Sequence, residues 1–77
     1  MKIKHDLKAD GVYIELSNKP YAYGKDLDEK RRIDYARDDT PIGVELLCVS
    51  KGVNPNDLPE QRAIIELLEQ EHIKVFA

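Results

Sequence analysis

The most apolar stretch of the chain reads Ile42-Gly43-Val44-Glu45-Leu46-Leu47-Cys48-Val49-Ser50. Every second residue from Ile42 to Cys48 is apolar, which places these side chains on one face. Leu47 and Val49 add apolar side chains to the opposite face, beside Glu45. Alternation with a period of two is typical of a strand. The pattern therefore predicts a strand over residues 42–50 with both faces covered over at least half of its length.

Shorter alternating segments precede this stretch, and turn-forming residues separate them. The clearest is Val12-Tyr13-Ile14-Glu15-Leu16, in which the apolar side chains share one face. Gly24 interrupts the alternation of another segment, which predicts a short or bulged strand there. Together the segments predict an antiparallel β-meander of four to five strands, with the earlier strands at residues 2–5, 12–16, 21–27 and 31–36.

The period changes to 3.6 after the loop at residues 51–56. Asp57 is a good N-cap, Glu60 three residues later would complete a capping box, and Pro59 fits the first turn. We therefore predict a helix over residues 57–72 that packs on one face of the sheet, with an inward stripe formed by Ile64, Leu67, Leu68, Ile65 and His72.

These elements predict an α+β fold: a single domain over residues 1–77, with a β-meander at 1–50, a helix at 57–72 and a tail at 73–77. The tail alternates and could add a short strand or pack along a sheet edge. A chain of 77 residues buries only about 60% of its unfolded surface. Domains of this size usually need a disulfide, a metal ion or a partner chain.

The first two supplements lack support in the sequence. Cys48 is the only cysteine, so an internal disulfide cannot form, and its apolar neighbours predict a buried thiol. His5 and His72 lie near opposite ends of the chain, without other ligands at zinc-binding spacing. Oligomerisation remains, and we predict a homodimer with Leu47 and Val49 at its interface.

Composition narrows the class of protein further. Hydrophobic residues make up 42% and charged residues 35% of the chain, which predicts a folded domain. The net charge of −3 argues against a general affinity for nucleic acid. Neither a signal-length nor a membrane-length apolar segment is present, so we expect a cytoplasmic protein without a membrane contact.

The segment from Lys2 to Ser50 resembles domain-of-unknown-function family 2283, short proteins of bacteria, archaea and phages. Three blocks carry the resemblance: Asp6, Ala9 and Asp10 leading into residues 12–17; Ile33-Asp34-Tyr35 before an acidic turn; and residues 42–47. The resemblance implies a small β-rich domain with a helix behind it and no established activity. It also implies an accessory or antitoxin-like role, because members are often encoded beside small toxin-like proteins.

One basic run, Lys30-Arg31-Arg32, follows two tyrosines, Tyr21 and Tyr23. Tyrosine and arginine are enriched at binding hot spots. The candidate partner-binding residues are therefore Tyr21, Tyr23, Arg31 and Arg32. No nucleotide, metal or nucleophile motif is present, and no cofactor is expected. We therefore predict a non-enzymatic interaction module that could also bind a heterologous protein.

Glu45 supports an alternative. It is a carboxylate among apolar neighbours, and Tyr13, Arg31 or Arg32 on adjacent strands could converge on it. Such convergence would indicate a small-ligand-binding domain or a small enzyme with a site on the sheet face. A third hypothesis is a nucleic-acid accessory protein that uses residues 30–32.

Overall fold

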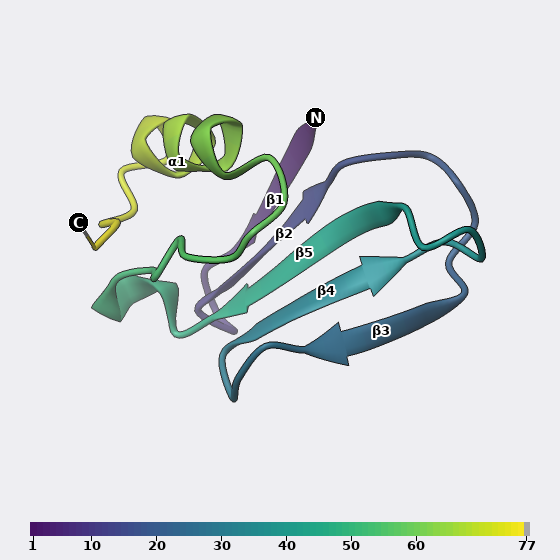
Figure 1. The fold of residues 1–77 in the computed structure, drawn as a ribbon. Coiled ribbons are helices and arrows are strands. Elements are labelled where there is room, and N and C mark those ends of the chain that lie inside the picture. Colours follow the sequence, from purple (N-terminus) through teal and green to yellow (C-terminus); the bar gives the residue numbers. More distant parts are fainter. Residues whose placement is uncertain (77) are drawn as a thin grey trace.

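The computed structural model describes residues 1–76 and confirms the α+β class: an antiparallel five-stranded sheet followed by one helix. The helix lies over one face of the sheet, and the loop that leads to it crosses the same face (Figure 1). The elements are β1 (Lys2–Asp6), β2 (Gly11–Glu15), β3 (Tyr23–Asp26), β4 (Arg31–Tyr35), β5 (Pro41–Leu47), a 3₁₀ turn η1 (Val49–Lys51) and α1 (Gln61–Gln70).

The strand order is β1-β2-β5-β4-β3, so the predicted meander holds within β3, β4 and β5 but not across the whole sheet. The chain leaves the β1–β2 hairpin through residues 16–22, reaches the far edge, and returns to place β5 beside β2. This position suits the most apolar strand, because Ile42, Val44 and Leu46 are each at most 6% exposed at the sheet centre.

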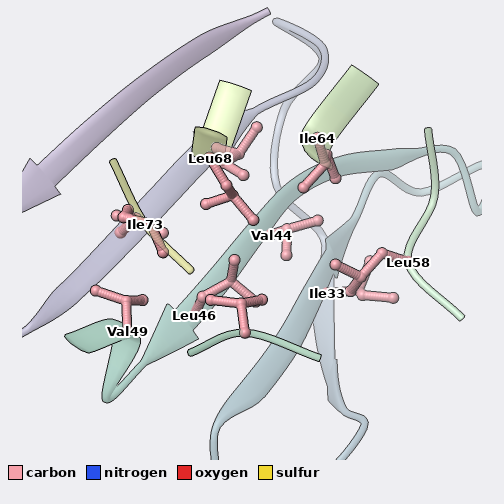
Figure 2. Packing of buried hydrophobic residues seen from close by; sticks show 11 residues of the cluster. Ile33, Val44, Leu46, Val49, Leu58, Ile64, Leu68 and Ile73 are labelled. Atoms are coloured by element: carbon pink, nitrogen blue, oxygen red, sulfur yellow. The ribbon is translucent and has the colours of Figure 1, made fainter. Parts of the chain in front are cut away.

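The hydrophobic core lies between the sheet and the segments that follow β5 (Figure 2). Ile64 and Leu68 of the predicted helical stripe are fully buried, while Leu67 packs at the edge of the cluster. The remaining buried members are Val12, Ile14, Ile33, Val44, Leu46, Val49, Val53, Leu58 and Ile73. Segments after β5 thus supply about half of the core.

Strand β5 ends at Leu47, earlier than predicted. Cys48 adopts a left-handed conformation (φ 55°) and is only half-buried, and Val49 begins η1. Asp10 explains the turn: its carbonyl accepts the Val49 N–H at 3.0 Å, and its carboxylate accepts the Ser50 N–H at 2.9 Å and hydroxyl at 2.6 Å. Val49 is therefore turned into the core, with 2% of its surface exposed.

The predicted helix start was wrong. Asp57 and Glu60 have positive φ angles of 66° and 53°. Glu60 occupies the N-cap position without a side-chain capping hydrogen bond, and α1 spans only Gln61–Gln70 rather than 57–72. Pro59 disfavours helical geometry at Leu58, whose side chain instead joins the core. Because Leu58 is buried between two turns of the loop, the first regular helical turn begins only after Glu60.

The tail pairs with the loop and not with the sheet. Val75 forms an isolated parallel bridge with Val53. The Val53 N–H donates to the Lys74 carbonyl at 2.8 Å, and the Phe76 N–H donates to the Val53 carbonyl at 2.9 Å. Of the predicted tail at residues 73–77, Ala77 lies outside the described residues.

Removing a fully buried side chain of α1 tests the role of the helix as a cover. Ile64→Ala leaves a cavity at a site with 0% exposure, so we expect the free energy of unfolding to fall by about 2–5 kcal/mol. Urea unfolding followed by circular dichroism measures the loss. Leu7→Ala is the control, since Leu7 is 82% exposed and should change stability by less than about 0.5 kcal/mol. Equal losses would contradict the packing.

The Asp10–Ser50 contact should make the free energy of unfolding depend on pH in the acidic range. Hydrogen bonds from Ser50 lower the pKa of the Asp10 carboxyl below its ordinary value of 3.8. A lowered pKa adds stability above pH 3.8 that disappears as the pH falls through the folded value. Ser50→Ala should lower the Tm near neutral pH and flatten its decline in acid. An unchanged acid profile in this variant would contradict the contact.

Candidate functional site: the open sheet face

The face opposite α1 has no covering element among the described residues. Strand register places side chains from all five strands on it in rows across the sheet. One row reads Lys4, Tyr13, Glu45, Arg32 and Asp26; its neighbour reads Lys2, Glu15, Gly43, Asp34 and Gly24. We call these two rows, together with Leu47, the open face.

Asp34 is the centre of a polar network on this face. The Tyr13 hydroxyl donates to Asp34 Oδ2 at 2.9 Å, and Arg32 Nε lies 3.4 Å from Asp34 Oδ1. The Arg32 guanidinium also donates to Asp26 Oδ1 at 3.0 Å and to the Tyr21 hydroxyl at 3.4 Å. The network therefore joins β2, β4 and β3 with the loop before β3.

Two glycines make room for this network. A Cβ atom at Gly43 would overlap the Tyr13 hydroxyl and ring, and one at Gly24 would overlap the Arg32 guanidinium. The Tyr13 ring and the Arg32 guanidinium therefore lie across neighbouring strands, over positions that have no side chain.

Electrostatics keeps both side chains in one protonation state near neutral pH. Burial and the hydrogen bond to Asp34 raise the pKa of Tyr13 to about 12. The hydrogen bonds of Arg32 to Tyr21 and Asp26 raise its pKa above the ordinary value. Tyr13 thus remains a neutral donor and Arg32 a cation, while both oxygens of Asp34 are occupied by them.

The four candidate partner-binding residues do not form one surface. Tyr21 and Arg32 meet on the open face, where 58% of Tyr21 is exposed. Tyr23 projects from the opposite face, stacks on Tyr35 with ring centroids 5.0 Å apart, and bonds to Asp39. Adjacent strand residues point to opposite faces, so Arg31 also leaves Arg32 on the other side.

Arg31 connects the sheet to the loop before the helix. Its guanidinium donates to Asp28 Oδ2 at 2.8 Å and to the carbonyls of Asn54 and Asn56 at 3.0 and 2.6 Å. With 11% of its side chain exposed, Arg31 satisfies backbone carbonyls that face the sheet. Local sequence does not indicate this role, because the carbonyls that Arg31 contacts lie more than twenty residues later in the chain.

The predicted interface pair is also divided. Leu47 lies on the open face and is 40% exposed, whereas Val49 is in the core. Glu45 is exposed between Tyr13 and Arg32, but both neighbours direct their polar atoms to Asp34. Sequence reasoning missed Asp34, whose only signal was its place two residues after Arg32 on one strand face.

The described part of the chain contains no cluster of three or more histidine, cysteine, aspartate or glutamate side chains that could hold a metal ion. His5 lies on the covered face, where its Nδ1 is 3.7 Å from Glu71 Oε1. Within residues 1–76 no helix has the length and apolar character to cross a membrane.

The fold and this face define a small α+β domain with one bare sheet face. Residues 2–50 match the model of the family described as Protein of unknown function (DUF2283), and the chain belongs to this family. No curated protein and no solved structure matches the chain. The matched segment contains all five strands and most of η1 and ends before α1.

Gly43→Ala tests whether the open-face network is built on the missing side chain. The new methyl group would displace the Tyr13 ring from Asp34, so we expect the pKa of Tyr13 to fall from about 12 toward 10. The raised pKa also adds stability that is complete below pH 10 and lost as the pH rises toward 12. NMR titration of the assigned Tyr13 ring measures the shift, with the Tyr23 ring as internal control. A Tyr13 pKa that stays near 12 would contradict the arrangement.

Proposed function

We propose that this chain is a protein-interaction module that forms a homodimer through the open face, with Leu47 in the interface. The observation that carries the proposal is a bare sheet face on which Tyr13 and Arg32 are already fixed beside an exposed leucine. Side chains that are ordered before binding lose less conformational entropy when a partner covers them. Tyrosine and arginine are also the residue types enriched at binding hot spots.

The shape of the open face supports a second copy of the chain as the partner. Glu45 and Leu47 form a ridge along β5, with a hollow of about 250 Å³ toward β1 and β2 and one of about 390 Å³ toward β4 and β3. A twofold interface brings the same surface of two copies together. A ridge beside hollows fits such an interface, because the leucine of each copy can enter a hollow of the other.

The charge pattern also suits self-association. Along one row the charged side chains alternate in sign, from Lys4 to Glu45, Arg32 and Asp26. A face with both signs can pair with a rotated copy of itself, and complementary charges guide encounter and register. Nucleic acid is a poorer partner, because the acidic side chains Asp26, Asp34, Glu15 and Glu45 outnumber the cations Lys2, Lys4 and Arg32 on the two rows.

A catalytic or ligand-binding site around Glu45 receives less support. Tyr13 and Arg32 form their hydrogen bonds with Asp34, and Arg31 lies on the covered face. Glu45 therefore lacks the converging partners that tune a carboxylate for acid–base chemistry.

Leu47→Lys tests the dimer. We expect wild-type protein to have the mass of two chains and the variant that of one, because the substitution places a lysine of each copy in the twofold interface. Sedimentation equilibrium measures both masses, and circular dichroism shows whether the fold is kept.

Leu7→Lys is the matched control, since it introduces the same charge at a leucine that is 82% exposed in the β1–β2 turn, and it should leave the dimer intact. A monomeric wild type, or a folded Leu47→Lys variant that remains dimeric, would overturn the proposal. A stoichiometric complex with a different protein in place of the dimer would overturn its choice of a second copy.

A further inference from the structure

A hollow of about 370 Å³ lies at the end of the sheet where β5 stops. The β3–β4 turn at residues 28–30 forms one side, and residues 51–54 with Phe76 form the other. Pockets for small molecules have volumes of about 300–1,000 Å³, so the hollow is large enough for a small organic molecule.

The lining is predominantly apolar. Leu46, Leu47, Val53 and Phe76 contribute hydrocarbon surface. Gly52 has a φ of 99°, and a Cβ atom there would lie 2.6 Å from Phe76 Cζ. The Phe76 ring is thus seated against the glycine backbone, and the Phe76 N–H holds the tail to the Val53 carbonyl at 2.9 Å.

Arg31 fixes the two sides of the hollow relative to each other. It bonds to Asp28 on one side and to the Asn54 carbonyl on the other. Asp28 also accepts the Lys30 N–H at 2.9 Å, and these contacts hold the pKa of its carboxyl below the ordinary value. Asp28 is therefore ionised, and Arg31 balances its charge within the wall. The hollow is formed before any ligand enters.

The charged groups that remain at the rim are Lys30, Lys51 and Glu29. None of the three forms an ion pair with another residue in the described part of the chain. The two lysines come from opposite sides, so both ammonium groups can approach one anion. Among the described lining residues, two positive charges and one negative charge leave a surplus of one, which suits a monoanion better than a polyphosphate.

We propose that this hollow binds a small monocarboxylate with an apolar body, such as an aryl-substituted acid. The carboxylate lies between Lys30 and Lys51, and the apolar body lies against Leu46, Val53 and the Phe76 ring. Aromatic rings contact one another favourably in offset or edge-to-face geometry. The site is separate from the network of Tyr13, Arg32 and Asp34, although its lining shares Lys30 and Leu47 with the hollow toward β4 and β3.

Two-dimensional ¹H–¹⁵N NMR of the full chain, titrated with phenylacetate, tests the site. We expect saturable shifts of the Leu46, Val53 and Phe76 amides with a Kd of about 1 mM or tighter, a normal affinity for a ligand of this size. Phenylacetamide has the same body without the charge and should bind at least about fivefold more weakly.

Lys51→Gln and Lys30→Gln should each weaken phenylacetate binding by about fivefold or more while leaving phenylacetamide binding unchanged. Lys8→Gln is the matched control, because Lys8 lies in the β1–β2 turn and does not line the hollow. The same spectra show whether each variant is folded. Absence of saturable shifts at these amides, equal affinity for the amide, or equal effects of Lys8→Gln and Lys51→Gln would overturn the proposal. Oligomeric mass, measured separately, decides the dimer whatever the titration gives.

Discussion

Burial of β5 on both edges and on one face is the constraint on which the rest of the structure depends. Val44 and Leu46 can lose contact with water only if β2 and β4 pair on either side and another layer covers the face. The order of the sheet, the long crossing at residues 16–22 and the return of the chain after Leu47 all serve this burial. Apolar burial is worth about 25 cal/mol per Å², and Ile42, Val44 and Leu46 of this strand are all buried.

Charged side chains at β4 show how one short motif serves two faces. Arg31 and Arg32 are neighbours in sequence, yet strand alternation sends one to backbone carbonyls of the loop and the other to Asp34 and Asp26. The first attaches the covering layer to the sheet. The second shapes the face that remains bare, so a single pair of arginines contributes to both sides of the domain.

The fold class and the five strands could be predicted because they depend on local alternation, as in Val12-Tyr13-Ile14. Where the prediction failed, contacts distant in sequence overrode local signals. The capping pattern of Asp57 and Glu60 yielded to burial of Leu58, and the end of β5 was set by Asp10, about forty residues earlier in the chain. The site was less predictable still, because the meeting of Tyr13 with Asp34 requires the strand order.

The part of the chain that matches its family ends at residue 50, while Leu58, Ile64, Leu68 and Ile73 come later and complete the core. The matched segment is therefore a sheet with one apolar face, and the residues that cover this face lie outside the segment. A chain built from this segment alone would need another element to cover the apolar face, either a different C-terminal segment or another molecule. In this protein the covering segment belongs to the same chain, and Arg31 joins it to the sheet through the Asn54 and Asn56 carbonyls.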